Sequence, residues 1–344
     1  MATNFTFKIN QYLPDYLLNY IKKIEKYLYP VLSDGIFNNL NHLGKFSFPS
    51  YSPNGWPIRT LNLDLNDSSL FKRIRIQGVL FDRNNIEVFE PNAGINYKRL
   101  EFNKIGKPYL HAVGFIPKGG ALAKYTNNAA TILPYLKKYC NVDTLLAFGE
   151  YEVTFHGERL GFLILGDECE SESRGYHIIS QYFKSNGKVN EDIEQKILSL
   201  CEVYKGFLSR GFIHGSPHPH NFAFDRKVWI KDYEDISHAS KLTKSQHIAY
   251  LVRDIRYFFM SICYASQWDN KDMIKEVFSL CSMTLLDHTN ELDFNDFVIY
   301  SNECAYRRTL FDEIFYQENN IEDVEHPIVE FSKSIQKTYL ANLI

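Results

Sequence analysis

One polar stretch of the chain gathers residue types that could hold a metal ion beside phosphate groups. The loop His214-Gly-Ser-Pro-His-Pro-His-Asn221 leads into two short apolar segments joined by a turn, and Asp232 follows the second directly. A hairpin brings the residues at its open end together, so Asn221 and Asp232 are expected to meet at one point. Oxygen ligands at one point suit a hard cation such as Mg²⁺, which usually shares its coordination with substrate phosphates. We therefore predict that Asn221 and Asp232 bind Mg²⁺.

The loop at 214–221 contains no Asp or Glu, so Ser or His side chains would have to transfer any proton there. Ser216 cannot act as a general base at neutral pH without an activating partner. His218 and His220 could accept a proton, because imidazole titrates near neutrality. These three residues are the candidate catalytic residues. Zinc binding by the three histidines of the loop is an alternative, although sites of histidine alone at this spacing are unusual.

The loop resembles the catalytic loop His-Gly-Asp-x-His-Pro-x-Asn of aminoglycoside and choline phosphotransferases, which belong to the protein-kinase-like superfamily. The positions in register are His214, Gly215, His218, Pro219 and Asn221. Ser216 departs from the pattern, because it stands where those families keep their catalytic Asp. The resemblance implies that Asp232 is the metal-binding Asp that follows the loop and that His214 supports the loop structurally.

A second segment, Arg253-Asp254-Ile-Arg-Tyr-Phe-Phe259, resembles the helix of kinase-like folds whose Asp braces the catalytic loop. The resemblance implies that Asp254 accepts hydrogen bonds from loop N–H groups, which need partners when they are buried. The alternative is a surface Asp paired with a neighbouring Arg.

Two lysines and a pair of glycines are candidates for nucleotide binding. Lys124 lies in an expected strand just before an expected helix, and Lys104 lies earlier in the chain. Gly119 and Gly120 belong to an expected turn, where backbone N–H groups could cradle phosphates. Residues 101–148 are weakly similar to selenoprotein O, a kinase-like protein that transfers AMP, and this similarity implies that both lysines contact the nucleotide. Either lysine could equally be a solvated residue of its strand.

The expected helix at 127–139 has no acidic residue that could hold a phosphate-binding lysine. Kinase-like lobes usually carry a Glu there, so the helix departs from the resemblance. Glu150 or Glu152, later in the chain, could substitute.

The elements that must position these residues follow from the apolar pattern. Helical spacing predicts helices within 1–45 and from about 190 onward, including 244–265, 271–286, 294–317 and a tail from 327. Alternating or short apolar segments predict strands at 72–81, 86–89, 97–102, 109–115, 121–125, 144–148 and 159–165. Residues 46–66 and 166–173 are expected to be loops, the second a connection between lobes.

This order, with the resemblance, predicts an α+β, two-lobed protein-kinase-like fold. A helical appendage and loop would occupy 1–66, a β-rich N-lobe 67–166, and a mostly helical C-lobe 167–344.

The composition limits the partners. The chain has 344 residues and a formal net charge of −3, so no basic excess indicates nucleic acid as a partner. The sequence contains no run of about 20 apolar residues, so no membrane span is expected. The N-terminus lacks a signal pattern. Six scattered cysteines are typical of reduced thiols in a cytoplasmic protein.

Two functions are compatible with the sequence. The first is an ATP- and Mg²⁺-dependent transferase that moves a phosphoryl or adenylyl group to an unidentified small-molecule or protein acceptor. The second is a pseudokinase, which would bind nucleotide or protein partners without catalysis, as Ser216 and the missing helix Glu suggest. The sequence identifies no acceptor.

Overall fold

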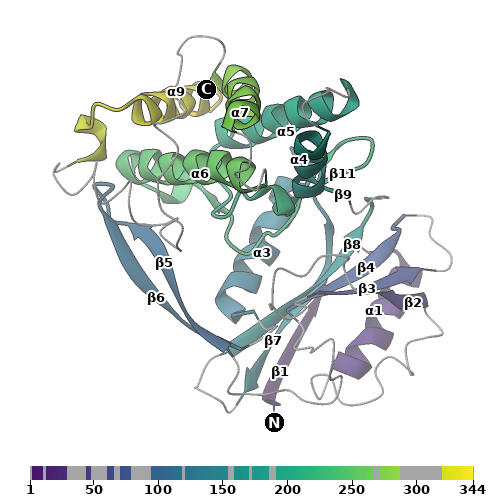
Figure 1. Cartoon of the computed structure of the whole chain (residues 1–344). Helices are drawn as coiled ribbons and strands as arrows, with labels where there is room; N and C mark the ends of the chain where they lie inside the picture. The colour runs from purple at the N-terminus through teal and green to yellow at the C-terminus, as the bar shows by residue number, and fades with distance from the viewer. Residues whose placement is uncertain are drawn as a thin grey trace. The chain divides into compact units, whose positions relative to one another are not determined.

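The computed structural model describes residues 2–10, 13–28, 44–47, 60–65, 70–78, 94–117, 121–153, 159–169, 173–185, 191–265, 271–286 and 320–343. Proximity of Cα atoms divides the chain into two compact units. Unit 1 comprises Met1–Lys98 and Ala112–Glu172, and unit 2 comprises Arg99–His111 and Ser173–Ile344. Figure 1 labels many elements of both units.

An antiparallel six-stranded sheet forms the centre of unit 1, in the order β1-β7-β8-β4-β3-β2. The strands are β1 (Ala2–Ile9), β2 (Gly44–Ser47), β3 (Thr60–Leu65), β4 (Arg73–Gln77), β7 (Thr144–Val153) and β8 (Arg159–Asp167). β8 is buried along nearly its whole length. Burial on both faces explains why its sequence is a continuous apolar run and not an alternating one.

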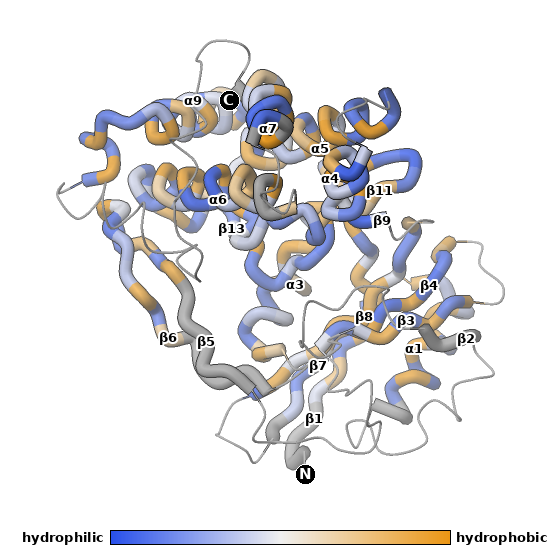
Figure 2. The backbone as a smooth tube through the Cα atoms, viewed as in Figure 1, coloured by the Kyte–Doolittle hydropathy of each residue, from blue (hydrophilic) through white to orange (hydrophobic). Residues whose placement is uncertain are grey.

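Two helices of unit 1, α1 (Asp15–Leu28) and α3 (Ala123–Leu136), pack beside this sheet. Leu17, Ile21 and Ile24 of α1 join the apolar core formed with the strands, and Figure 2 shows apolar residues alternating with polar ones along that helix. Helix α3 lies close to β8 because residue 161 is glycine. A Cβ atom at Gly161 would lie 1.9 Å from Oγ1 of Thr126.

The N-terminal segment does not form the separate helical appendage that the sequence predicted. β1 pairs with β7, β2 with β3, and β3 with β4. The three strands before residue 66 therefore belong to the same sheet as the strands expected in the N-lobe. A domain boundary at residue 66 is therefore wrong. The loop prediction is also wrong at Thr60–Leu65, where Leu61 and Leu63 are fully buried.

Unit 2 is mainly helical. The α-helices described in it are α4 (Gly175–Lys184), α5 (Glu191–Ser209), α6 (Lys244–Ala265), α7 (Lys271–Leu286) and α9 (Pro327–Ala341). The sequence-based bounds of α6 and α7 are confirmed, α4 was not predicted, and the helix expected at 294–317 lies outside the described residues. The fold is therefore mixed α and β, as predicted, while the two-lobed kinase-like arrangement stays a prediction.

Short strands of unit 2 frame the loop at 214–221. β12 (Val228–Ile230), β11 (Phe222–Phe224) and β9 (Ser173–Arg174) form a small sheet in that order. β10 (Phe212–Ile213) pairs with β13 (Ser237–His238). The loop ends in a 3₁₀ turn at Pro219–Asn221, directly before β11. These elements are all short, so their stability depends on the buried helices around them.

A hairpin of β5 (Gly94–Phe102) and β6 (Pro108–Pro117) carries its turn into unit 2. Gln246 Nε2 of α6 donates to the carbonyl of Phe102 at 2.9 Å, and Arg253 Nη1 donates to that of Leu100 at 3.2 Å. The Phe102 ring packs edge-on against Tyr250. These contacts explain why residues 99–111, expected in the N-lobe, cluster with the helical unit.

Helix α9 closes over the turn that precedes the loop. Gly211 has a φ of +81°, and a Cβ atom there would lie 2.5 Å from the ring of Tyr339. The Tyr339 ring also packs edge-on against His238 and His247. Only glycine accommodates both the backbone conformation and the close ring. Among the described helices, none combines the length and apolar character that a membrane crossing requires.

Candidate functional site

The carboxylate of Asp254 holds the start of the loop. Its Oδ2 atom accepts hydrogen bonds from the backbone N–H of His214 at 2.8 Å and of Gly215 at 2.9 Å. Its Oδ1 atom accepts from Nη2 of Arg253 at 2.9 Å. Asp254 is fully buried, so the neighbouring guanidinium and the two amides replace the water that a buried carboxylate loses. The structure thus brings Asp254 to the loop, as the sequence suggested.

Asn221 and Asp232 meet at the open end of the hairpin formed by β11 and β12. Nδ2 of Asn221 donates to Oδ2 of Asp232 at 3.2 Å and to the carbonyl oxygen of Ser216 at 2.8 Å. Two acceptors on one nitrogen fix the orientation of the amide. Oδ1 of Asn221 is therefore the atom that a cation could use, beside the carboxylate of Asp232. Both side chains are partly exposed.

Asp232 adopts a backbone conformation that few residues accept. Its φ is +63°, and it is the one non-glycine residue with positive φ in the described part of the chain. Lys231, just before it, is held on both sides: its N–H donates to the carbonyl of Asn221 at 2.8 Å, and its carbonyl accepts from Nε2 of His214 at 3.1 Å. The left-handed conformation costs about 1–2 kcal/mol for a residue with a Cβ atom. The surrounding bonds therefore hold Asp232 in a strained position.

His214 is a structural residue of the loop. A carbonyl oxygen can only accept, so the bond to Lys231 places the ring proton on Nε2. Burial lowers the pKa of His214, with a smaller opposing effect from Asp254. The neutral ring packs near Phe207 and Phe222. Its role is to connect the loop to the residue that precedes Asp232.

His218 caps the 3₁₀ turn and is poorly suited to accept a proton. Its Nδ1 atom accepts from the backbone N–H of His220 at 3.2 Å, which leaves the ring proton on Nε2. Burial lowers the pKa of His218 to about 4. At neutral pH the ring is thus a neutral N–H donor, and the prediction of a His218 base loses its physical basis.

His220 lies in a stack of three nearly parallel rings. Its ring is 4.1 Å from the Tyr176 ring and 4.8 Å from the His218 ring, centroid to centroid. Burial, together with smaller effects of His218, His177 and Arg174, lowers the pKa of His220 to about 2. A base of such low pKa accepts protons poorly at neutral pH.

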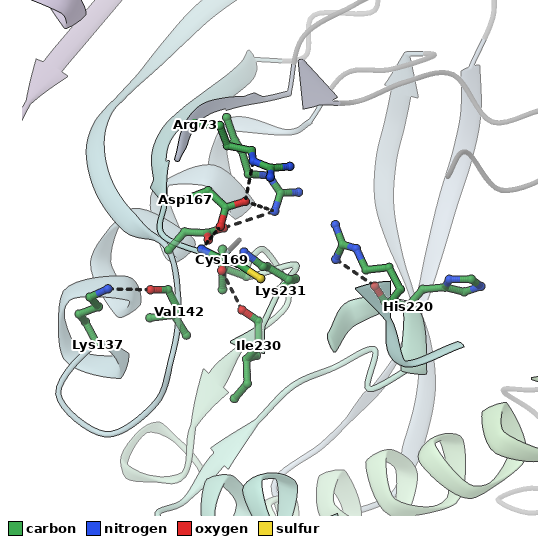
Figure 3. Close-up of polar contacts among 12 residues, drawn as sticks. Arg73, Lys137, Val142, Asp167, Cys169, His220, Ile230 and Lys231 are labelled. Atoms are coloured by element: carbon green, nitrogen blue, oxygen red, sulfur yellow. Dashed lines mark hydrogen bonds and ion pairs between the residues drawn. The ribbon is translucent and has the colours of Figure 1, made fainter. Parts of the chain in front are cut away.

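Two residues of this stack region were missed from the sequence. Tyr176 is the second residue of α4, and Nη1 of Arg174 donates to the carbonyl of His220 at 3.1 Å, as Figure 3 shows at the labelled His220. Arg174 lies opposite Ala223 in the small sheet. No spacing in the sequence connects residues 174–176 with the loop, so only the pairing of β9 with β11 reveals them.

The three histidines of the loop do not assemble a zinc site. The rings of His218 and His220 are only 2° from parallel, so their nitrogen atoms do not converge on one point. Nε2 of His214 is already bonded to the carbonyl of Lys231. No group of three or more metal-binding side chains is present among the residues that the structure describes.

In unit 1, Lys124 lies in the first turn of α3 and not on a strand, because the helix begins at Ala123. The N-terminus of α3 has no side-chain cap and no acidic residue in its first turn. The helix dipole and the exposed Lys124 make this end electropositive, which favours anions. Gly119 and Gly120, expected just before it, lie outside the described residues.

Glu150 on β7, the residue that could substitute for the missing helix Glu, contacts α3 and β8. Glu150 accepts a hydrogen bond from the amide of Asn127 and forms an ion pair with Arg159 at 3.3 Å. It therefore joins β7 to α3 and to β8.

Lys104 lies in the turn between β5 and β6, not on a strand. The side chain of Asn103 closes this turn by accepting from the N–H groups of Ile105 and Lys107 at 3.1 and 2.9 Å. The carbonyl of Lys104 accepts from Oγ1 of Thr243 at 2.7 Å. The turn serves to anchor the hairpin on α6, and Lys124 becomes the stronger phosphate candidate.

The end of β8 is a buried charge cluster. Asp167 faces Arg73 and Arg75 at 3.9 and 3.6 Å, as Figure 3 shows for Arg73, and its Oδ1 atom accepts from the N–H of Cys169 at 2.9 Å. The chain passes from unit 1 to unit 2 shortly afterwards, at residue 172. The expected connection at 166–173 thus begins at the end of β8, which the contacts of Asp167 hold in place.

We expect Lys124→Met to weaken the binding of Mg-ATP about ten-fold, because a hydrogen bond to a charged group contributes about 1.5–3 kcal/mol. Isothermal titration of the purified full chain measures this affinity. Lys138→Met, at an exposed position in the turn just after α3, is the matched control and should bind as the parent does. Equal affinity in the two variants would remove Lys124 from the site.

No protein-family model matches the sequence, and no curated protein matches it. Among solved structures, WaaP in complex with acyl carrier protein is 10% identical with a TM-score of 0.35, covering 72% of this chain and 89% of that one. A Toxoplasma gondii rhoptry antigen kinase domain is 11% identical with a TM-score of 0.32, covering 67% and 79%. Aerobactin synthetase IucC from Klebsiella pneumoniae is 13% identical with a TM-score of 0.26, covering 49% and 45%. Similarity at this level says nothing about substrate or activity.

Proposed function

We propose that the protein is an ATP- and Mg²⁺-dependent transferase of the kinase-like type, which moves a phosphoryl or adenylyl group. The observation that carries this proposal is the pairing of Asn221 with a strained Asp232 at the end of a braced loop. Strained backbone conformations persist where surrounding structure enforces them, and they concentrate at functional sites. A purely structural turn could place glycine at position 232 without this cost.

The donor set fits a hard divalent cation. The two side chains offer an amide oxygen and a carboxylate oxygen, and Mg²⁺ prefers oxygen ligands of this kind. Asn221 and Asp232 would hold the ion, which when bound neutralises charge on the nucleotide phosphates. Asp254 would keep the loop in place through its bonds to the N–H groups of His214 and Gly215, and His214 through the bond of its ring to the carbonyl of Lys231.

Asp232→Asn tests the proposal with little change in shape. It removes the negative charge that attracts the cation, so we expect the affinity for Mg-ATP to fall about 100-fold. Titration calorimetry with ATP and either Mg²⁺ or Mn²⁺ measures the loss. An affinity equal to that of the parent would refute the assignment of Asp232 as a metal ligand.

Two further substitutions separate a lost ligand from a damaged fold. Asp232→Gly and Asp232→Ala both remove the carboxylate, so both should lose Mg-ATP binding. Asp232→Gly should nevertheless be about 1 kcal/mol more stable to urea than Asp232→Ala, because glycine accepts the positive φ. A lower stability of the Gly variant would contradict the strain at this position.

A nucleotide-binding protein without catalysis is the second candidate. It is favoured by Ser216 at the position of the usual Asp and by the lowered pKa values of His218 and His220. Release of ADP or AMP from Mg-ATP, followed by chromatography over hours, distinguishes the two. Binding without any release would establish the second function.

A further inference from the structure

Two buried polar atoms beside the start of the loop lack a hydrogen-bond partner among the described residues. They are the hydroxyl of Tyr204, on α5, and Nδ1 of His214, the first residue of the loop. Both side chains are fully buried. Buried polar groups are normally hydrogen-bonded, to protein or to ordered water, so two such exceptions in one place need a physical explanation.

The two atoms have complementary hydrogen-bonding roles. Nε2 of His214 donates to the carbonyl of Lys231 at 3.1 Å, so in the neutral ring Nδ1 is an acceptor. The Tyr204 hydroxyl is a donor. Burial raises the pKa of Tyr204 well above its usual value, and the carboxylate of Asp254 raises it further, so the proton stays on the oxygen. A donor and an acceptor are therefore both without partners beside the loop.

The same aromatic rings enclose both side chains. The Phe222 ring lies 6.0 Å from the Tyr204 ring and 5.6 Å from the His214 ring, centroid to centroid. The Phe207 ring lies 6.4 and 6.0 Å from the same two rings. The charge of Asp254 acts on both groups. Neighbouring buried polar atoms that do not bond directly to each other are typical of places where proteins hold an internal water molecule.

We propose that one buried water molecule connects the Tyr204 hydroxyl to Nδ1 of His214, and that Tyr204 is thereby a positioning residue for the metal site. A buried water needs at least about two polar partners, and these two atoms provide them. Water both donates and accepts, so the bridge does not depend on the titration of either side chain. It would join α5 to the loop through a contact that neither element makes directly.

The bridge reaches the metal site through His214. The ring of His214 holds the carbonyl of Lys231, and Lys231 directly precedes Asp232, whose φ of +63° its surroundings must maintain. Outer-shell groups of this kind orient metal ligands, and their loss typically lowers metal affinity about 10–100-fold. The positioning role rests on the proposed transferase function, whereas the water bridge itself does not.

Tyr204→Phe tests the bridge in the purified full chain, because it removes the hydroxyl and keeps the ring in its stack with Phe258. Removal of a buried hydroxyl that has no partner leaves stability unchanged or raises it, so the sign of the change is decisive. We expect Tyr204→Phe to lower the urea midpoint and to shift the ¹⁵N resonance of Nδ1 in His214. A midpoint equal to or above that of the parent, or an unmoved resonance, would overturn the bridge.

His214→Gln shows whether His214 is the partner of Tyr204, and its spectrum assigns the His214 resonance. The glutamine keeps an N–H group that can bond to the carbonyl of Lys231 and has no counterpart of Nδ1. In a double-mutant cycle, Tyr204→Phe should therefore lower the urea midpoint less than half as much in the His214→Gln background as in the parent. An undiminished effect of Tyr204→Phe in that background would overturn the assignment of His214 as the partner.

Calorimetry with Mg-ATP in the absence of urea tests the positioning role. We expect Tyr204→Phe to weaken the affinity about ten-fold. Tyr151→Phe is the matched control, because Tyr151 is a buried tyrosine of unit 1 whose hydroxyl donates to the carbonyl of Gly78 at 3.4 Å. This control should bind within about two-fold of the parent. Equal affinity in Tyr204→Phe and the parent would overturn the positioning role. If the parent binds no Mg-ATP, the proposed function fails, while the urea and ¹⁵N results still decide the bridge.

Discussion

Replacement of Asp254 by alanine is expected to lower the free energy of unfolding by about 3–5 kcal/mol. The N–H groups of His214 and Gly215 both donate to one oxygen of this carboxylate, and each buried donor without an acceptor costs about 1–3 kcal/mol. The guanidinium of Arg253 would also lose its buried partner. The same change should abolish nucleotide binding, because the loop that carries Asn221 loses its anchor.

Urea unfolding measures the stability, and hydrogen exchange of the His214 and Gly215 amides shows whether the loss is local. The stability of Asp254→Asn to urea should lie between those of the parent and the Ala variant. Its amide oxygen can still accept from the loop, while its NH₂ group faces Arg253. Asp272→Ala, at an exposed position in the first turn of α7, should cost less than about 1 kcal/mol. A cost for Asp254→Ala as small as this control would refute the brace.

Acidification from pH 7 to pH 5 is expected to remove about 4 kcal/mol of stability through two histidines. Burial lowers the pKa of His218 and of His247 to about 4 in the folded state, whereas unfolded histidine titrates near 6.5. The unfolded chain therefore binds protons first as pH falls. The stabilisation is complete above about pH 6.5 and is lost toward pH 4, with about 2 kcal/mol per histidine gone at pH 5.

Urea midpoints measured in half-unit steps between pH 7.5 and pH 5 test this dependence. His247 is the better probe, because it packs against Tyr339 of α9 and is not one of the candidate site residues. Its Nε2 atom has no hydrogen-bond partner among the described residues. His247→Phe should reduce the loss of stability between pH 7 and pH 5 by about 2 kcal/mol. An unchanged slope in that variant, or a parent protein equally stable at pH 5 and pH 7, would contradict the buried neutral histidines.

The helices of unit 2 could be predicted because their signal is local. In α5, Ile197, Leu200 and Leu208 are buried residues on one helical face, and the spacing of such residues is visible in the sequence alone. α4 has a weaker signal, since it begins at Gly175 without a side-chain cap. It was missed, and the ring stack of Tyr176 with it.

The early strands could not be predicted because their signal depends on distant partners. β3 reads Thr-Leu-Asn-Leu-Asp-Leu, which alternates well, but it follows a run rich in Pro, Ser and Asn. Asn62 is fully buried despite being polar, which only the pairing of β3 with both β2 and β4 explains. β1 likewise becomes a strand through β7, far along the chain.

The loop shows the same division between local and distant signals. The order of residues from His214 to Asn221 pointed to the right hairpin, and Asp232 does meet Asn221. The protonation of His218 depends on which ring nitrogen accepts from His220, and this follows from the side-chain rotamer and the turn. The spacing of the residues suggested that His218 is a base, whereas the bonds of the 3₁₀ turn make its ring a hydrogen-bond donor.

The contact between Tyr339 and Gly211 has a consequence for the order of events during synthesis. The turn at Gly211 opens directly into β10 and the loop, yet its buried surface is completed by a ring that the ribosome adds much later. A nascent chain that has passed Asp254 can form the brace but still leaves this side of the turn open to water. The site is therefore expected to mature after translation of α9, and ribosome-bound chains stopped before residue 327 should be cut by proteases near Gly211.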